Sequence, residues 1–314
     1  MRILTDSEVC SLLDPAEVVD AIEAAFARDY RVTAVMPVRT QVEVASRGVL
    51  LVMPCYDSAV PGLGTKLVTV FENPAERVQA NYALLDPVSG ELRVLMAANY
   101  LTDVRTAATS AVATRHMARQ DANILGIFGT GRQARSHIEV LSAVHQFGCV
   151  LVCGSSAERS QAFAAGMANE LGVAIEPADA RTCASQSDVI CTCTTSSTPV
   201  IEGRWLRPGT HLNLVGAFQP EKREVDSQTV RLARVVVDTY EGALAEAGDL
   251  LIPMNEGVIS REHVVADLHE VISGKKAGRT SADEITVFKN LGCALEDLVT
   301  ATLAYRKAEQ CASA

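Results

Sequence analysis

The sequence predicts an α/β protein that contains a doubly wound parallel sheet, preceded by a smaller α+β domain. From Asn123 onward, short apolar runs alternate with helical stretches, a pattern typical of parallel sheets with right-handed crossovers. Before Asn123, several β-like runs follow one another closely, which indicates antiparallel strands. The chain has 314 residues, a length that accommodates about two domains.

The N-terminal part is expected to begin with a helix and to continue as strands. Asp14 can cap a helix whose first residue is Pro15. The β-like runs that follow are 39–44, 49–53, 64–70 and 82–86, and a turn at 87–90 leads into a hairpin partner at 91–96. An alanine-rich helix is predicted over 102–117. This part is therefore a mixed α+β domain.

A glycine-rich turn follows the first strand of the second part. Ile124–Phe128 has the apolar character of a buried strand, and a helix is expected over 132–143. Strand, G-x-G-x-x-A turn and helix together form the dinucleotide-binding fingerprint of a Rossmann-type sheet. Gly129 permits the tight turn, Gly131 lets the backbone approach a pyrophosphate, and Ala134 allows close packing. The pattern predicts a nicotinamide or flavin nucleotide site; its alternative is a glycine turn in an unrelated α/β domain.

The remaining elements continue the alternation. Further strands are expected at 150–153, 173–175, 189–194, 211–215 and 235–238, with a helix at 157–171. A last helix is expected at 292–306, and the sequence leaves open whether it returns to the N-terminal domain. We predict one domain over residues 1–118, with 292–314 as a possible addition, and a Rossmann domain over 119–291.

The end of the second strand bears on the choice of cofactor. An NAD-preferring site places an acid there to accept from the ribose 2′-OH. This chain has Gly154, Ser155 and Ser156 instead, with Arg159 shortly after. Serine and arginine side chains suit a 2′-phosphate, so the sequence favours NADP over NAD, or use of both. The alternative is that Arg159 is a solvated charge on a helix surface.

Composition and charge limit the partners. The formal net charge is −10, which argues against a nucleic-acid partner. No stretch reaches the ~20 apolar residues of a membrane span, and the first residues lack the apolar run of a signal peptide, so we expect a cytoplasmic protein. The nine cysteines show no zinc-binding spacing and are expected to be buried, reduced thiols. No metal site is predicted.

Three isolated cations lie in apolar or β-like surroundings: Arg39, Lys66 and Arg105. A buried cation requires a counter-charge or water, and a bound substrate carboxylate would serve, since the fork of an arginine matches it. Alternatively, each of the three cations forms a structural ion pair or lies at the surface. Their spacing in the sequence does not show that they come together in the fold. The six histidines fit no ligand pattern and are expected to be structural.

Two sequence motifs are distinctive among Rossmann proteins: Leu-Thr-x-x-Arg-Thr-Ala-Ala and Asp-Glu-Ile-Thr-Val-Phe-Lys. Together with the glycine-rich turn they belong to a set of segments at 61–68, 101–111, 126–134, 214–226, 247–250 and 278–292. Through these segments the chain resembles the ornithine cyclodeaminase/mu-crystallin family nearly from end to end, and the two motifs are specific to that family.

The resemblance implies a homodimer whose N-terminal domain serves substrate binding and dimerisation. It implies NAD or NADP as cofactor, and small α-amino acids or cyclic imino acids as substrates. Arg39, Lys66 and Arg105 fall on positions that hold the substrate carboxylate and polarise the reacting nitrogen, with Lys66 as the catalytic residue. The residues assigned to the cofactor are Gly129, Thr130, Gly131, Arg132, Gln133, Ser155, Ser156, Arg159, Thr194, Val215 and Gly216.

One departure from the family pattern concerns the loop after the fifth strand. Cyclodeaminases of the family carry an aspartate there, and this chain has Phe218. Phenylalanine cannot act as the general base that ornithine cyclisation needs. The replacement favours an oxidoreductase acting on a C=N or C–N bond, like ketimine or 1-pyrroline-2-carboxylate reductases. The alternatives are an ornithine cyclodeaminase that forms proline and ammonia while regenerating NAD, and a non-catalytic NADPH-dependent binding protein like mu-crystallin.

Overall fold

The computed structural model describes residues 2–45, 47–71 and 78–313. The chain divides into two units: unit 1 comprises Met1–Thr109 and Gly292–Ala314, and unit 2 comprises Ser110–Leu291. The division falls inside helix α4 (Asn99–Met117). It therefore lies earlier than the expected boundary at residue 118, because one continuous helix passes from unit 1 to unit 2.

Unit 1 is built on a seven-stranded sheet with the order β1-β7-β6-β5-β4-β2, in which β3 pairs with β4. All pairs are antiparallel except β1 with β7. The strands are β1 (Arg2–Leu4), β2 (Ala34–Val35), β3 (Thr40–Val44), β4 (Gly48–Asp57), β5 (Gly62–Phe71), β6 (Val78–Leu85) and β7 (Leu92–Ala97).

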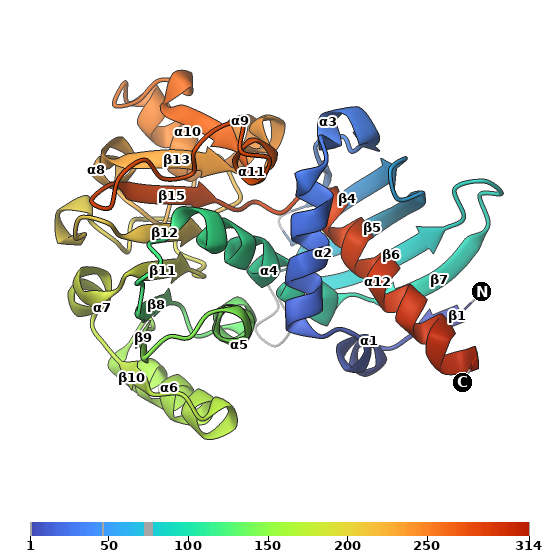
Figure 1. Cartoon of the computed structure of the whole chain (residues 1–314), viewed down its shortest axis with the longest axis horizontal. Helices are drawn as coiled ribbons and strands as arrows, with labels where there is room; N and C mark the ends of the chain where they lie inside the picture. Colours follow the sequence, from blue (N-terminus) through green and yellow to red (C-terminus); the bar gives the residue numbers. More distant parts are fainter. Residues whose placement is uncertain (1, 46, 72–77, 314) are drawn as a thin grey trace. The chain divides into compact units, whose positions relative to one another are not determined.

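Two helices cover one face of this sheet. Helix α2 (Pro15–Ala27) and helix α12 (Ala294–Ser313) lie side by side, and α12 packs against β4, β5 and β6 (Figure 1). Asp14 caps α2, as predicted, by accepting from the backbone N–H groups of Ala16 and Glu17. The short helices α1 (Asp6–Leu12) and α3 (Tyr30–Thr33) complete the unit.

Unit 2 contains an eight-stranded, entirely parallel sheet with the order β10-β9-β8-β11-β12-β15-β13-β14. The order reverses between β8 and β11, and ligands of such sheets bind at that switch point, outside the carboxyl ends of the strands. The strands are β8 (Ile124–Phe128), β9 (Cys149–Cys153), β10 (Ile175–Pro177), β11 (Val189–Thr192), β12 (His211–Leu214), β13 (Ala233–Val237), β14 (Val264–Asp267) and β15 (Ile285–Lys289).

The connections between these strands are mostly helical (Figure 1). The α-helices are α5 (Arg132–Val144), α6 (Ala157–Leu171), α7 (Ala180–Gln186), α8 (Ser227–Leu232), α9 (Tyr240–Glu246), α10 (Gly248–Asn255) and α11 (Leu268–Ile272). Two 3₁₀ turns, Gly203–Trp205 and Arg261–His263, precede β12 and β14.

The predicted fold class is confirmed, and several elements differ from the prediction. The third strand of unit 2 lies at Ile175–Pro177 rather than at 173–175, and the strands β1, β2, β14 and β15 were not expected. Strand β15 inserts between β12 and β13. The last helix starts at Ala294 because Gly292 has a φ of +77°, outside the helical region.

No helix in the described ranges is long and apolar enough to cross a membrane. The same residues contain no group of histidine, cysteine and acidic side chains arranged to hold a metal ion. None of the nine cysteines forms a disulfide. Three of them are buried and four are partly buried, but the prediction of burial is wrong for Cys10 and Cys311, which are exposed.

Candidate active site

The glycine-rich turn joins β8 to α5 at the switch point of the unit 2 sheet. Gly129 has a φ of +117°, and a Cβ added to it would lie 2.4 Å from the carbonyl oxygen of Cys193. The turn therefore requires glycine at this position. A Cβ added to Gly131 would meet no heavy atom within 4 Å. Gly131 is the N-cap of α5 and no side chain caps the helix, a geometry that suits a pyrophosphate at the helix N-terminus.

The residues after β9 lie beside this turn. Ser155 and Arg159 are exposed, as a contact with a 2′-phosphate would require. The Ser156 hydroxyl oxygen accepts from the backbone N–H of Arg159 at 3.3 Å and caps α6. The structure therefore gives Ser156 a structural task, and it leaves Ser155 and Arg159 at the surface.

A buried carboxylate, Glu224, holds the two loops that follow β11 and β12. Its Oε1 accepts from the N–H and the hydroxyl of Thr194, at 2.8 and 2.7 Å. Its Oε2 accepts from the Thr192 hydroxyl at 2.7 Å and from the N–H groups of Gly216 and Ala217, at 2.6 and 3.3 Å. Two of the residues assigned to the cofactor, Thr194 and Gly216, are thus fixed by one side chain.

A second buried pair supports Glu224. Lys289, at the end of β15, donates to Asp249 Oδ2 at 3.0 Å, and both side chains are fully buried. Asp249 Oδ1 in turn accepts from the backbone N–H of Glu224 at 2.7 Å. Burial and the charge of Asp249 raise the pKa of Glu224, while Lys289 and the threonine hydroxyls oppose this.

Phe218 lies in the loop after β12 and packs against the hydrophobic core of unit 2. The acidic residues near it do not replace the missing aspartate. Glu224 is committed to the two loops, and Asp226 caps α8 by accepting from the N–H of Thr229 at 2.8 Å. Glu221 is exposed.

One buried histidine connects the start of α5 to the rest of unit 2. His137 Nδ1 lies 2.7 Å from the carbonyl oxygen of Gln133, and Nε2 lies 3.0 Å from the hydroxyl of Ser110. Asn290, which follows β15, donates to the same hydroxyl at 3.0 Å. Burial lowers the pKa of His137 to about 4. A neutral ring donating to Gln133 is a structural element of the turn, as the sequence suggested for the histidines.

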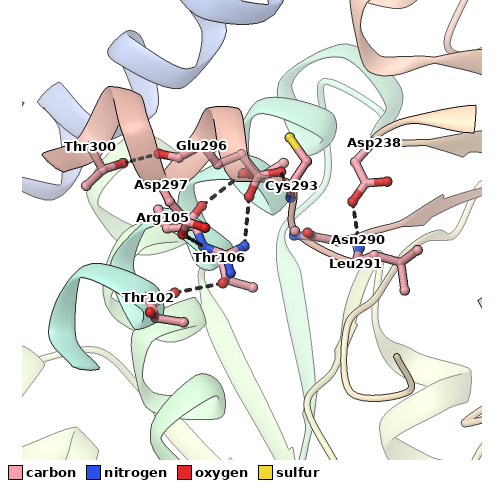
Figure 2. A network of polar contacts seen from close by, with 12 residues as sticks. Thr102, Arg105, Thr106, Asp238, Asn290, Leu291, Cys293, Glu296, Asp297 and Thr300 are labelled. Carbon is pink, nitrogen blue, oxygen red and sulfur yellow. Dashed lines mark hydrogen bonds and ion pairs between the residues drawn. The ribbon is translucent and has the colours of Figure 1, made fainter. Parts of the chain in front are cut away.

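The cations Lys66 and Arg105 come together with two carboxylates in unit 1. Lys66 lies on β5 and donates to Asp297 Oδ1 at 2.7 Å. Arg105 lies on α4; its Nη1 donates to Glu296 Oε2 at 2.8 Å and its Nε is 2.8 Å from Asp297 Oδ1. Figure 2 shows Arg105 with these two partners, which belong to the first turn of α12. The side chains of all four are at most 6% exposed.

The third predicted cation, Arg39, precedes β3 and reaches the same place. Its Nη2 donates to the carbonyl oxygen of Gly292 at 3.3 Å. A Cβ added to Gly292 would lie 1.9 Å from Nη1 of Arg105. Gly292 therefore gives the Arg105 guanidinium the space to reach α12. We call Arg39, Lys66, Arg105, Glu296 and Asp297 the charged cluster.

The surroundings change the acidity of both buried cations. Burial and the charges of Arg105 and Arg39 lower the pKa of Lys66 to about 8, although Asp297 opposes the shift. Burial would also lower the pKa of Arg105, but Asp297 and Glu296 outweigh it and hold that pKa above its usual range. Arg105 is thus a permanent charge, whereas Lys66 can exchange a proton near neutral pH.

Sequence reasoning identified the three cations and missed their carboxylate partners. Glu296 and Asp297 lie between Leu295 and Leu298 in the first turn of the last helix. Acids are common in a first turn because they complement the helix dipole, so the pattern gave no reason to single them out. The role of Glu224 was missed as well, because its five donors come from two separate segments, the end of β11 with the residues after it and the loop after β12.

Comparison with known proteins shows the family of the chain. The sequence matches the model of the "Ornithine cyclodeaminase/mu-crystallin family" over residues 1–312. Ketimine reductase mu-crystallin of Mus musculus is 39% identical over 300 residues, which cover 94% of this chain and 91% of the relative.

Two solved structures have the same fold. Delta(1)-pyrroline-2-carboxylate reductase of Thermococcus litoralis, in complex with NADH and L-proline, matches with a TM-score of 0.96 at 39% identity, covering 99% of this chain and 98% of that chain. An archaeal alanine dehydrogenase dimer with bound NAD matches with a TM-score of 0.93 at 32% identity, covering 99% and 97%. The chain belongs to the ornithine cyclodeaminase/mu-crystallin family.

Proposed function

We propose that this protein is an NAD(P)-dependent oxidoreductase that reduces the C=N bond of a small cyclic imino acid, such as 1-pyrroline-2-carboxylate, or oxidises an α-amino acid in reverse. The observation that carries the proposal is the charged cluster, in which a titratable lysine lies beside two arginines. The similarity to a pyrroline-2-carboxylate reductase and to a ketimine reductase supports it. The cytoplasmic location that we expect from the sequence stays a prediction.

The cluster suits a substrate carboxylate. Lys66 and Arg105 are balanced by the two carboxylates of α12, and Arg39 brings a further positive charge to the same place. Arginine binds a carboxylate through two parallel N–H donors, which fixes its orientation as well as its position. We assign Arg39 and Arg105 to this role. Because an anchored carboxylate orients the adjacent C=N bond, the anchoring supplies a large part of the rate.

Unit 2 fits a nicotinamide dinucleotide. The open space at Gly131, the uncapped start of α5 and the loops held by Glu224 suit a pyrophosphate and its two nucleosides. When bound, the reduced nicotinamide supplies the hydride that the imine carbon accepts. Exposed Ser155 and Arg159 favour NADPH over NADH. Thr130, Arg132, Gln133 and Val215 complete the proposed site.

Lys66 is the proposed proton donor. With a pKa of about 8 it is charged at neutral pH and still acidic enough to give up a proton. An imine nitrogen needs that proton when its carbon accepts a hydride. Phe218, which packs on the core of unit 2, offers no base for the cyclisation of ornithine, so we favour imine reduction over cyclodeamination.

Turnover of 1-pyrroline-2-carboxylate tests this proposal. We expect oxidation of NADPH, and more slowly of NADH, and a loss in kcat/KM of about 10²–10⁴-fold in Lys66→Ala. Lys307→Ala, which removes a surface lysine paired with Glu17, should leave the rate unchanged. Turnover that survives in Lys66→Ala would exclude Lys66 as the donor. Formation of proline and ammonia from ornithine without net production of NADH would establish a cyclodeaminase. Tight NADPH binding without turnover of any compound in a panel of imino and amino acids would establish a binding protein.

We also propose that two copies associate through the uncovered face of the unit 1 sheet. The strand register places Val35, Val42, Val44, Tyr56 and Leu67 on one face, and each is between 36% and 67% exposed. A contiguous apolar face of this kind marks an interaction site. The occupant we propose is a second copy of the chain, because a similar structure is a dimer.

A charged residue on this face tests the proposed dimer. We expect the wild-type protein to sediment as a dimer and Val42→Glu to sediment as a monomer, because a carboxylate would be buried without a partner in the interface. Val88→Glu is the matched control: Val88 is 95% exposed in the turn between β6 and β7. A wild-type monomer, or a Val42→Glu dimer of unchanged stability, would contradict the proposed interface.

A further inference from the structure

Asp297 stands at the centre of the charged cluster, and it contacts both buried cations through one atom. Lys66 Nζ donates to Oδ1 at 2.7 Å, and Arg105 Nε lies 2.8 Å from the same oxygen. The Asp297 side chain is completely buried. Among the acids described above, it is the one in direct contact with the titratable lysine.

The two oxygens of Asp297 are used unequally. In the part of the chain that the structure describes, Oδ2 is buried without a hydrogen-bond partner. Glu296 differs: its Oε2 accepts from Arg105 and its Oε1 from the N–H of Cys293 at 3.2 Å. Glu224 uses both oxygens for five donors. Buried carboxylates with a structural task have their acceptors filled, so the open oxygen of Asp297 sets it apart.

The groups that face Lys66 explain what Asp297 must do. Arg105 on α4 and Arg39 before β3 repel the ammonium, and burial disfavours it as well. Tyr82 on β6 lies opposite Lys66 in the strand register, and burial and the charge of Asp297 raise its pKa. Burial and the charges of Asp57 and Asp297 raise the pKa of Cys55 on β4, so both groups stay neutral. Of these groups, Asp297 alone favours the charged lysine.

We propose that Asp297 is a positioning residue that keeps Lys66 charged and aims its remaining N–H groups toward the imine nitrogen, which makes Lys66 the proton donor of the reduction. This inference rests on the proposed function. As the imine carbon accepts the hydride, the electron pair of the C=N bond moves to nitrogen, and nitrogen takes a proton from Lys66 Nζ. The neutral lysine that remains regains a proton from water.

The pH dependence of Asp297→Asn tests the proposal. Removing the anion makes the Lys66 proton easier to lose, so the fall in kcat on the alkaline side should move from near pH 8 to a pH lower by roughly 1–3 units. Glu296→Gln removes a carboxylate that contacts Arg105 but not Lys66, so it should change KM and leave the alkaline limb in place. The proposal would be overturned if kcat of Asp297→Asn fell at the same alkaline pH as that of the wild type, or if Glu296→Gln shifted this pH equally.

Binding of pyrrole-2-carboxylate, a planar ring carboxylate, gives a readout that needs no turnover. The affinity of the wild-type protein for this probe, measured by titration calorimetry, should fall above about pH 8. In Asp297→Asn the fall should begin at lower pH, and in Lys66→Met the affinity should not fall in this pH range. If the wild-type enzyme turns over but the affinity of Asp297→Asn falls at the same pH as that of the wild type, this inference is refuted and the proposed function stands. If the wild-type protein neither binds the probe nor turns over, the proposed function fails and the inference with it.

A double variant guards against misfolding of Asp297→Asn. Lys66→Met/Asp297→Asn removes the ion pair as a whole, which proteins tolerate better than the loss of one partner. Because Asp297 acts through Lys66, the double variant should have the kcat of Lys66→Met alone. A further loss by the same factor that Asp297→Asn causes on its own would show that the two residues act independently.

Discussion

Arg105→Leu is expected to lower the thermal stability of the protein sharply and to abolish turnover. The substitution removes the guanidinium that pairs with both Glu296 and Asp297, two completely buried carboxylates. Breaking a buried ion pair by removing one partner costs about 3–5 kcal/mol, a large fraction of the roughly 5–15 kcal/mol that stabilises a domain. The measurement is the midpoint of thermal unfolding, followed by circular dichroism.

Two further variants separate charge from shape at this position. Arg105→Lys keeps the charge and loses the fork, so it should be less destabilised than Arg105→Leu but should bind the substrate carboxylate poorly. Arg105→Leu/Glu296→Gln removes one uncompensated anion and should regain part of the stability. If Arg105→Leu unfolds at the wild-type temperature, Arg105 does not balance the carboxylates of α12.

Glu224→Gln should weaken cofactor binding by at least about tenfold and destabilise unit 2. The amide replaces one of two acceptor oxygens by a donor, which would face N–H or O–H groups on the loops after β11 and β12. Hydrogen bonds to a charged group contribute about 1.5–3 kcal/mol each, and leaving a buried donor unsatisfied costs about 1–3 kcal/mol. Fluorescence titration with NADPH and thermal unfolding measure the two effects.

Glu221→Gln is the matched control for this prediction. Glu221 lies on the same segment and is exposed, so its neutralisation should change neither cofactor affinity nor stability beyond a few tenths of a kcal/mol. A Glu224→Gln protein with wild-type NADPH affinity would show that the two loops keep their conformation without the carboxylate.

The elements that sequence could predict are those whose signal is local. Asp14 and Pro15 mark the start of α2, and Gly129, Gly131 and Ala134 mark the β8–α5 turn within a few residues. Strand β15 was missed because only three of its five residues are apolar, which gives a weak strand signal. Its neighbours β12 and β13 precede it in the sequence, so the order along the chain does not indicate where it inserts.

The cations of the site could be selected from the sequence because charge in an apolar segment is conspicuous there. Their partners could not. Asp297 meets Lys66 across more than two hundred residues of chain, and its position in the first turn of a helix has an ordinary explanation. The partner of Lys289 could not be predicted either, because Lys289 ends strand β15 and its partner Asp249 lies on helix α10, 40 residues earlier in the chain.

The late position of β15 and α12 has a consequence for synthesis of the chain. The parallel sheet has no strand between β12 and β13 until residues 285–289 are available, and one sheet face of unit 1 lacks α12 until residues 294–313 follow. Contacts of such long sequence separation form slowly because their loops must close first. While the chain emerges from the ribosome, apolar surface of both units stays exposed until these segments are made, so nascent protein should need chaperone protection longer than its two-domain size suggests.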